Sequence, residues 1–374
     1  MGVNYNVLGL IFASLHDSTV IDLTKHRTMG SIMFGGRYRL IDFPLSSMVN
    51  SGIYEVGVIT KSNYGSLLDH LGSGREWDLA RKKGGLHLLP PFSQEGSSVY
   101  RGRLEALHNV WSFLEHSKAE YVVMSDCDYV TTIDFSAVVE QHIKSGADIT
   151  TVYGKYLYSE DSGSCVDVLE MDEDGRIRNV MIDPQISGEC NICLDMFVMR
   201  KDFLRKLVRD AASKSQYSII RDCLQARVND YKLMGYEHKG YFSRIDSVKS
   251  YFDANLALLE EKNRTALFKP SAPVYTKIGD NGPAKYGLDA KVKNSLIADG
   301  CIIEGTVENC GLFRGVKVGK GSVLKNCELQ QGTKVGAGCA LSNVIADKNV
   351  EVADGRVLTG SETYPIYISK NAKL

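Results

Sequence analysis

Short apolar runs alternate with amphipathic stretches through the first two thirds of the chain. The runs are rich in β-branched and aromatic residues, which predicts strands, and they span Val7–Ala13, Val56–Thr60, Tyr121–Asp126 and Ile149–Tyr153. Apolar residues at helical spacing predict helices over Leu67–His70, Arg103–His116, Phe135–Lys144 and Lys201–Ala212. Strands that alternate with helices are typical of a mostly parallel sheet with helices on both faces. This part of the chain is therefore predicted to be an α/β domain.

The last third of the chain follows a different pattern. From about Leu296 on, short aliphatic pieces succeed one another, and the pieces that begin at Val318, Val335 and Val352 are spaced by 17 residues. That spacing is close to three six-residue faces per coil, which predicts a left-handed parallel β-helix built from hexapeptide repeats. A plain antiparallel β domain is the alternative, and the scarcity of two-residue hairpin signals disfavours it.

These patterns divide the chain into two domains. A helical pattern over Asp246–Asn263 leads out of the α/β part. We predict an α/β domain over residues 1–265, a linker over 266–289 and a β-helix over 290–374. Ligands of open α/β sheets lie at the carboxyl ends of the strands, so we expect any chemistry in the loops after Ala13 and after Met124.

Composition narrows the class of protein. The 374 residues carry a net charge of −1 without a dominant cluster of Lys and Arg, which argues against a nucleic-acid partner. No apolar stretch approaches the roughly 20 residues of a membrane helix, and no basic segment precedes Val7–Ala13, so neither a membrane partner nor a signal peptide is expected. Nine scattered cysteines, with one isolated CxxC at Cys190 and Cys193, are typical of reduced thiols rather than of a zinc site. We expect a cytoplasmic protein.

One run of the sequence carries a family resemblance. Residues Phe34–Ile53 read FGGRYRLIDFPLSSMVNSGI, which resembles the signature of ADP-glucose pyrophosphorylase (glucose-1-phosphate adenylyltransferase). Further similar pieces follow in the same order along nearly the whole chain, at Trp77–Leu79, Arg81–Gly85, Leu89–Pro91, Val292–Leu296 and Gly305–Asn309. The resemblance implies a Rossmann-like nucleotidyltransferase domain of the GT-A-like kind, with a mixed and mostly parallel sheet, followed by the left-handed β-helix. It also implies the reaction of ATP with glucose 1-phosphate, assisted by Mg²⁺, to give ADP-glucose and diphosphate.

The nucleotide loop of that family is altered in this chain. The family's loop is of the type Gly-Gly-x-Gly-x-Arg, and a Lys-Pro pair precedes the FGG run. Glycines there let backbone N–H groups approach phosphates, while the arginine and the lysine add charge. Counting back from Phe34, these glycine, arginine and lysine positions hold Ser14, Leu15, Asp17, Thr19 and Met29. We predict that these side chains fill the space of a phosphate and that Asp17 repels it.

The metal site implied by the resemblance is only half retained. Asp128 aligns with one metal-binding carboxylate of the family, and the other carboxylate follows a Gly-Tyr-Trp type run. Here the residue after Gly240–Ser243 is Arg244. Two unit charges 4 Å apart interact by about 4 kcal/mol at an effective dielectric of 20, so this arginine would oppose Mg²⁺. Arg244 is instead a candidate to replace the cation, and Asp246 could supply a ligand only through a β-bulge. A loop cap is the alternative role of Asp128.

The sugar-phosphate site has changed as well. Val180–Pro184 corresponds to a family segment with a Glu-Lys-Pro motif, and Asp183 stands where the lysine is expected. Two glycine positions of the family correspond to Asp195 and Asp167. Glycine lets a substrate lie against the backbone, so carboxylates at these points are predicted to clash with it. The resemblance therefore implies a degenerate site without a functional catalytic residue, in which Asp128 is the remnant.

These losses favour a regulatory, non-catalytic subunit of the family over an active enzyme. Such a chain needs no cofactor of its own, with Asp128 as the remaining candidate metal ligand, and Mg²⁺ would belong to a catalytic partner subunit. The resemblance suggests a heterotetramer with that partner. Arg37 and Arg39 resemble positions that the family uses near its anionic effector site, which predicts a sugar-phosphate or nucleotide effector; plain surface charge is the alternative.

Three other functions stay open. The first is an active sugar-1-phosphate nucleotidyltransferase with a rebuilt nucleotide loop. The second is a hexapeptide-repeat acyltransferase, which is disfavoured because such enzymes generally use a histidine base on the β-helix, whereas no histidine follows His238. The third is a purely structural role in an assembly.

Overall fold

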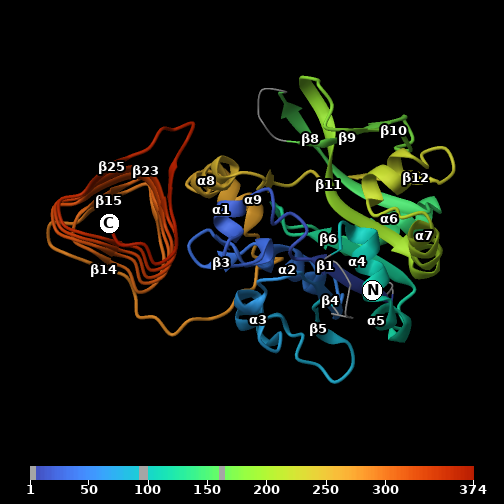
Figure 1. Cartoon of the computed structure of the whole chain (residues 1–374), viewed down its shortest axis with the longest axis horizontal. Coiled ribbons are helices and arrows are strands. Elements are labelled where there is room, and N and C mark those ends of the chain that lie inside the picture. Colours follow the sequence, from blue (N-terminus) through green and yellow to red (C-terminus); the bar gives the residue numbers. More distant parts are fainter. Residues whose placement is uncertain (1–5, 92–99, 160–164) are drawn as a thin grey trace.

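The computed structural model describes residues 6–91, 100–159 and 165–374. Two bodies lie side by side, an α/β domain and a C-terminal coil of triangular cross-section (Figure 1). The helices α8 (Val248–Ala257) and α9 (Glu261–Leu267) lie between the sheet of the first body and the coil. Among the described residues, none of the helices combines the length and the apolar character that a membrane crossing requires.

A nine-stranded mixed sheet forms the centre of the α/β domain. Its strands are β1 (Val7–Phe12), β4 (Glu55–Ile59), β5 (Gly85–Leu89), β6 (Tyr121–Asp126), β8 (Ile149–Tyr158), β9 (Asp167–Met171), β10 (Ile177–Ile182), β11 (Gly188–Arg200) and β12 (Leu233–Glu237). β1 runs parallel to its neighbours β4 and β6, and β5 runs parallel to β4. β11 pairs antiparallel with β6, β8 and β9, so the later strands make the sheet mixed. The predicted α/β class is confirmed.

Helices and short elements surround this sheet. The remaining helices are α1 (Ile21–Thr24), α2 (Asp42–Asn50), α3 (Gly65–Leu71), α4 (Arg103–Asn109), α5 (Trp111–His116), α6 (Phe135–Ser145) and α7 (Lys201–Ser213). The short strands are β2 (Met33–Phe34), β3 (Tyr38–Arg39), β7 (Tyr129–Thr131) and β13 (Phe242–Arg244); two 3₁₀ turns span Met29–Ser31 and Arg75–Trp77, and a π turn spans Ile220–Gln225. The predicted helix over 103–116 is divided at Val110, whose backbone (φ −102°, ψ 15°) leaves the helical region. The pattern over 246–263 also forms two helices, and Ser247 caps the first of them.

Alternate residues of β1 enter two different cores. Leu8, Leu10 and Phe12 pack on one face of the sheet, whereas Ile11 packs on the other. The second core also receives the apolar residues of the run Phe34–Ile53, including Phe34, Leu40, Ile41, Phe43, Leu45 and Met48. Most of that run is therefore needed to fold the domain.

The C-terminal coil is a parallel β-helix. One face holds β14 (Lys285–Tyr286), β17 (Ile302–Ile303), β20 (Lys317–Val318), β22 (Lys334–Val335) and β24 (Glu351–Val352). The other strands are β15 (Lys291–Lys293), β16 (Leu296–Ile297), β18 (Thr306–Glu308), β19 (Gly311–Leu312), β21 (Val323–Leu329), β23 (Ala340–Ala346), β25 (Val357–Thr359) and β26 (Ile366–Ile368). Val335 pairs with both Val318 and Val352, so the 17-residue spacing is one coil, as predicted. The coil from Ile303 to Val318 is two residues shorter.

A buried polar network joins the β-helix to the α/β domain. The Arg27 guanidinium lies 2.6 Å from the nearer carboxylate oxygen of Asp347, and both side chains are buried. Arg27 also donates to Gln330 (3.1 Å), whose amide donates to the Tyr251 hydroxyl on α8 (3.3 Å). The Tyr367 hydroxyl donates to Asp347 (2.8 Å). Breaking a buried ion pair leaves an uncompensated charge, so this network holds the α/β domain and the β-helix in one relative orientation.

The domain boundaries stay predictions. In the structure α9 ends at Leu267 and parallel pairing of the coil begins at β14, inside the segment predicted as a linker. All nine cysteines are free thiols. Cys190 and Cys193 both lie on β11, and the one cluster of potential metal ligands among the described residues includes neither.

Candidate functional site

The carboxyl ends of β1 and β6 bring a charged cluster together. Phe12 at the end of β1 pairs with Asp126 at the end of β6, so the turns after both strands emerge at the same edge of the sheet. His16 comes from the first turn, Asp126 and Asp128 come from the second, and Asp195 reaches them from β11. This is the edge at which the sequence predicted chemistry.

Arg103, at the start of α4, holds two of these carboxylates. Its guanidinium contacts both oxygens of Asp126, at 2.6 and 3.1 Å, and one oxygen of Asp195 at 2.5 Å. All three side chains are buried. Burial alone would raise the pKa of Asp126, but the guanidinium and His16 outweigh burial and leave that pKa lowered. Burial likewise opposes the charge on Arg103, and the two carboxylates still raise its pKa. The three groups therefore form an internal ion triad.

His16 adds a second cation to the cluster. Its Nε2 lies 2.6 Å from Asp126 and 3.8 Å from Asp128. Burial lowers the pKa of His16, but the neighbouring carboxylates Asp128 and Asp126 outweigh it and raise the value to about 9. His16 is therefore protonated at neutral pH.

Arg244 is the third cation and lies against Asp128. The two side chains are 3.4 Å apart, and the guanidinium also contacts the carbonyl oxygen of Cys165 and lies over the ring of Tyr129. Burial raises the pKa of Asp128 to about 6, with His16 and Arg244 opposing it. Strand β13 pairs with β7 without a register shift from Phe242 to Arg244, and Asp246 lies two residues beyond the end of this strand.

The cluster does not fit the Mg²⁺ that the family resemblance implies. One ligand atom from each of His16, Asp126, Asp128 and Asp195 lies within 4.8 Å of the others, which is the spacing of a metal site. Mg²⁺ prefers an octahedron of oxygen ligands, however, and His16 offers a nitrogen that would first have to lose its proton. Arg103 occupies both Asp126 and Asp195. Arg103, His16 and Arg244 thus contact the three carboxylates of Asp126, Asp128 and Asp195. Within this cluster, Oδ1 of Asp128 is buried and lacks a hydrogen-bond partner among the described residues.

Hydrogen bonds within the protein satisfy the polar groups of the turn after β1. The Asp17 carboxylate accepts the Met29 backbone N–H (2.7 Å), and the Asp17 carbonyl oxygen accepts the Thr24 hydroxyl (2.7 Å). The Ser14 hydroxyl oxygen accepts the N–H of Lys61 (2.7 Å). Burial raises the pKa of Asp17 to about 7, although the Met29 N–H and Lys61 oppose this shift. This side chain, rather than a phosphate, satisfies the Met29 N–H.

The other predicted loop residues are also engaged in the fold. Met29 is buried in the core beside β1, and Leu15 packs against the opposite core. The Thr19 hydroxyl donates to the carbonyl oxygen of His16 (2.8 Å). The segment therefore has the contacts of an ordinary turn between a strand and a helix.

The three aspartates of the predicted sugar-phosphate site occupy different environments. Asp195 is buried and has a φ of 55°, in the left-handed region that favours glycine, as expected for a position that holds glycine in the family. Asp167 lies on β9, and burial together with the charge of Asp195 raises its pKa to about 6. Asp183 follows β10, is exposed and has a φ of 48°. Of these three, the structure brings Asp195 into the charged cluster.

Arg37 and Arg39 differ in their surroundings. Arg37 is exposed, whereas Arg39 is buried and donates to the carbonyl and the hydroxyl oxygen of Ser66 (2.6 and 2.9 Å). Burial lowers the pKa of Arg39 to about 10, with Asp42 opposing it. Burial, together with Arg39 and Arg27, also lowers the pKa of Lys348 to about 7. Arg39 thus lies at a junction of the domains that is rich in cations, and Arg37 precedes it by two residues in the chain.

Comparison with known proteins gives the class of this chain. Residues 10–261 match the family model described as nucleotidyl transferase, and residues 283–363 match the GlmU-like C-terminal hexapeptide model. The chain belongs to the nucleotidyl transferase family.

Three similar proteins indicate which members of the nucleotidyl transferase family this chain resembles. The chain is 36% identical over 367 residues to the glycogen biosynthesis protein GlgD of Bacillus subtilis (strain 168), covering 98% of this chain and 96% of that protein. It is 37% identical over 323 residues to the protein of the same name from Geobacillus stearothermophilus, covering 86% and 84%. It is 33% identical over 327 residues to glucose-1-phosphate adenylyltransferase of Clostridium botulinum, covering 86% and 84%. The family resemblance predicted from the sequence is confirmed.

No role was predicted for His16, Arg103 or Asp126 from the sequence, and the last two were named only as ends of a predicted helix and a predicted strand. One signal was present for Arg103, because it shares a helical face with Leu107 and Val110 at i+4 and i+7. A charged residue on an apolar stripe indicates a buried partner.

Proposed function

We propose that this chain is a non-catalytic, regulatory subunit of glucose-1-phosphate adenylyltransferase in bacterial glycogen biosynthesis. The observation that carries the proposal is the position of Arg103 and Arg244, whose guanidinium groups lie on the carboxylates that would face a metal ion. The names of the GlgD and adenylyltransferase relatives supply the pathway and the reaction.

The charge balance argues against binding of metal and phosphate. A divalent cation would have to displace Arg103 from two buried carboxylates and would face Arg244 and the protonated His16. On the nucleotide side, Asp17 already accepts the Met29 N–H, so that donor is not available to a phosphate. A barrier increase of about 6 kcal/mol would slow the chemistry by more than ten-thousandfold.

The proposal includes a partner and an effector. A catalytic subunit, assembled with this chain in a heterotetramer, would bind Mg²⁺ and the substrates. Arg37, exposed beside the cation-rich domain junction, and Arg39 are the proposed contacts of a sugar-phosphate or nucleotide effector. The buried Arg27–Asp347 pair then provides the mechanical link from that junction to the α/β domain.

Two assays with purified protein test this role. The single chain is incubated with Mg²⁺, ATP and glucose 1-phosphate, and ADP-glucose formation is expected at background level. A turnover of about 1 s⁻¹, ordinary for an enzyme, would contradict the proposal and support the active nucleotidyltransferase.

The second assay co-expresses the chain with a catalytic subunit of glucose-1-phosphate adenylyltransferase. The complex is expected to differ from the catalytic subunit alone in its activation by sugar phosphates. The Arg37→Ala variant tests the effector contact within the same complex. Identical kinetics with and without this chain would remove the basis of the regulatory role.

A further inference from the structure

Strand β21 places one acidic side chain on the face of the β-helix that meets the α/β domain. Cys327 and Leu329 belong to the hydrophobic core of the β-helix, so the alternation of the strand turns Glu328 outward. Ile345 pairs with Glu328 on the next coil and packs into the core of the α/β domain. The outer side of this row is therefore covered, and Glu328 is only 2% exposed.

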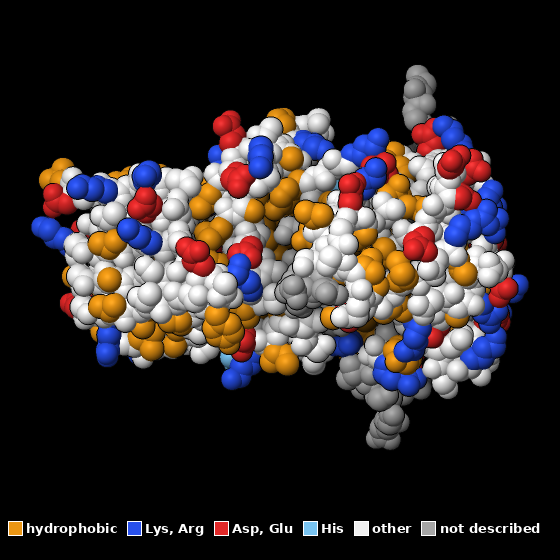
Figure 2. Space-filling model, turned by 90° about the horizontal axis from the view of Figure 1, so that it is seen from above, with side chains coloured by type: hydrophobic (Ala, Val, Ile, Leu, Met, Phe, Trp, Pro, Cys, Tyr) orange, Lys and Arg blue, Asp and Glu red, His pale blue; other side chains and the backbone are white. Residues whose placement is uncertain are grey.

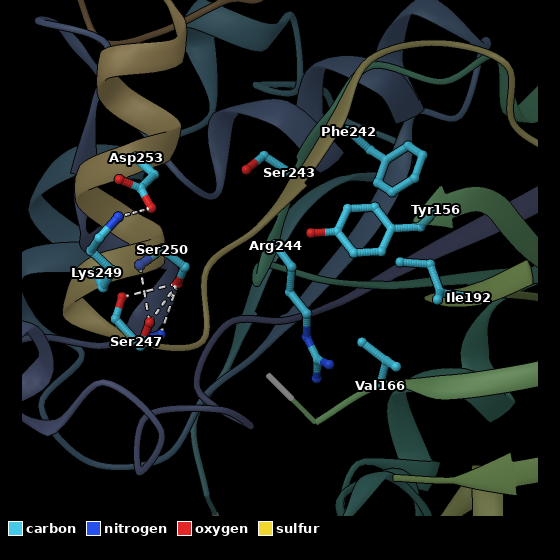
Figure 3. Close-up of a pocket in the computed structure, with 10 residues that line it drawn as sticks. All are labelled: Tyr156, Val166, Ile192, Phe242, Ser243, Arg244, Ser247, Lys249, Ser250 and Asp253. Atoms are coloured by element: carbon cyan, nitrogen blue, oxygen red, sulfur yellow. Dashed lines mark hydrogen bonds and ion pairs between the residues drawn. The ribbon is translucent and has the colours of Figure 1, made fainter. Parts of the chain in front are cut away.

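Helix α8 of the α/β domain packs against β21. Tyr251 on α8 is fully buried, and the Glu328 carboxyl group is near enough to act electrostatically on its hydroxyl group. The start of the same helix, with Ser247 and Ser250, lines a cavity of about 310 Å³ beside Arg244 (Figure 3). Helix α8 therefore contacts both the β-helix and the surroundings of the charged cluster.

The preceding coil leaves room for the carboxyl group of Glu328. Gly311 pairs with Glu328 on that coil, and any side chain at Gly311 would collide with the Glu328 carboxylate oxygens. The carboxyl group therefore lies over the backbone of Gly311, in space that only a glycine leaves free. Its place between the two domains is thus built into the β-helix.

Among the described residues, none forms a hydrogen bond or an ion pair with the Glu328 carboxyl group, on which burial and Cys327 act. The polar groups of the junction have other partners. The Tyr251 hydroxyl donates to the carbonyl oxygen of Met33 (2.8 Å). The Arg27 guanidinium is held by Asp347 and Gln330. Glu328 is therefore a buried acid without a cation to balance it.

The Glu328 carboxyl group accordingly carries a proton while the two domains are packed together. An unpaired carboxylate in a dry interior costs so much free energy that the group takes up a proton instead. Burial, assisted by Cys327, raises the pKa of this carboxyl group well above its ordinary value of 4.5. Glu328 also acts on the thiol of Cys310, but both thiols donate to backbone carbonyl oxygens at 3.1 Å and supply no positive charge.

We propose that Glu328 is a proton-sensitive contact between the two domains: its neutral carboxyl group allows close packing against α8, and its ionisation weakens the junction. An ionised carboxylate gains hydration that it can reach only when the β-helix and α8 move apart. Because α8 also lines the cavity beside Arg244, such a movement would change the surroundings of the charged cluster. This inference does not rest on the proposed regulatory function, since it concerns the single chain.

Infrared spectroscopy of the full chain tests the protonated state. At neutral pH, the native chain should show the C=O absorption of one more protonated carboxylic acid than the Glu328→Gln variant, which keeps the shape of the side chain. The matched control is Glu304→Gln, because Glu304 is an exposed glutamate of the same β-helix and its substitution should leave this absorption unchanged. A difference spectrum of native chain and Glu328→Gln without the absorption would overturn the proposal.

Unfolding of the same three proteins in urea, at several values of pH from 5 to 8, tests the effect on stability. Above the ordinary pKa of 4.5 the unfolded chain releases the Glu328 proton, whereas the folded chain keeps it, so the native chain loses stability as the pH rises. The folding equilibrium constant of Glu328→Gln, relative to that of the native chain, should therefore rise by up to about tenfold per pH unit. The ratio for Glu304→Gln should stay constant. A constant ratio for Glu328→Gln, or the same slope in both variants, would overturn the proposal.

Hydrogen exchange of the backbone amides of α8 tests whether the effect lies at the junction. Exchange should be faster in the native chain than in Glu328→Gln at pH 8, and the two should agree at pH 5. Equal exchange at both values of pH would overturn the proposal. These measurements use the chain alone, so their failure is distinct from a failure of the regulatory role, which is measured in the complex.

Discussion

Two buried arginines, Arg103 and Arg27, perform different tasks in this molecule. Arg103 joins α4, β6 and β11 within the α/β domain, at the edge of the sheet where open α/β sheets generally hold their ligands. Arg27 joins the α/β domain to Asp347 of the β-helix. The first arginine neutralises a site from within, and the second couples two bodies. Substitution of one arginine should therefore act within the α/β domain, and substitution of the other should act on the junction between the domains.

The charged side chains on the surface are arranged differently from these buried pairs. Basic and acidic side chains are interspersed over the face seen in Figure 2, without an extended basic area on that face. The charges around Arg103 and Arg27 are buried and paired, and substitution of these should separate the two tasks.

Arg103→Met is expected to have the largest effect on stability. It leaves Asp126 and Asp195 buried without their guanidinium, and breaking a buried ion pair in this way costs about 4 kcal/mol. Unfolding of the whole chain in guanidinium chloride measures the lost free energy of unfolding. Arg101→Met is the control, because Arg101 lies two residues from Arg103 in the sequence but pairs with Glu105 on the surface, so its loss should hardly change stability. Equal losses in the two variants would mean that the triad is not a structural element.

Arg27→Met is expected to have the next largest effect, about 3 kcal/mol, and to act between the domains. Asp347 keeps hydrogen bonds from the Tyr367 hydroxyl and from its neighbouring backbone N–H, which limits the loss. Calorimetry should resolve two unfolding transitions in this variant where the native chain shows stronger coupling. A single transition at an unchanged temperature would show that the junction does not depend on this pair.

The pH dependence of stability should report His16. Its folded pKa of about 9 lies above the ordinary value of 6.5, so its contribution is complete below pH 6.5 and is lost as the pH rises to 9. The contribution is on the order of 3 kcal/mol. Lys348, with a lowered pKa of about 7, acts in the opposite direction over part of this range. The measurement is therefore the difference between the native chain and His16→Gln, which should shrink from pH 6.5 to pH 9. A constant difference would contradict the protonated state of His16.

Arg37→Ala is expected to have the smallest effect on the isolated chain. The side chain is exposed, and substitutions at such positions usually change stability by less than about 0.5 kcal/mol. Arg39→Ala should cost more, because Arg39 is buried and bonded to Ser66. Thermal unfolding of the two variants tests this contrast, and equal destabilisation would show that the two arginines share one environment.

Periodic features of the fold could be predicted from the sequence. The spacing of Val318, Val335 and Val352 defined the β-helix coil because each stacked residue repeats one structural position. The strand at 121–126 was found because its apolar residues are consecutive in the sequence. The break at Val110 was missed, since helix periodicity continues across it and only the local backbone departs.

Much of the charged cluster could not be predicted in the same way. Arg103 meets partners 23 and 92 residues away, and no pattern of local spacing records such contacts. Asp128 and Arg244 were identified because flanking residues resemble the family's motifs, and the structure brings them together. The pairing of His16 with Asp126 depends on the register of β1 against β6, which becomes known only with the fold.

Manganese binding tests most directly the claim that the chain's own cations occupy the place of a metal. Mn²⁺ is titrated into the full native chain, and electron paramagnetic resonance measures the free aquo ion, with Asp128→Asn as the comparison. We predict that the free-ion signal is the same with the native chain and with the variant. Loss of about one equivalent of free Mn²⁺ per native chain, restored by Asp128→Asn, would contradict it.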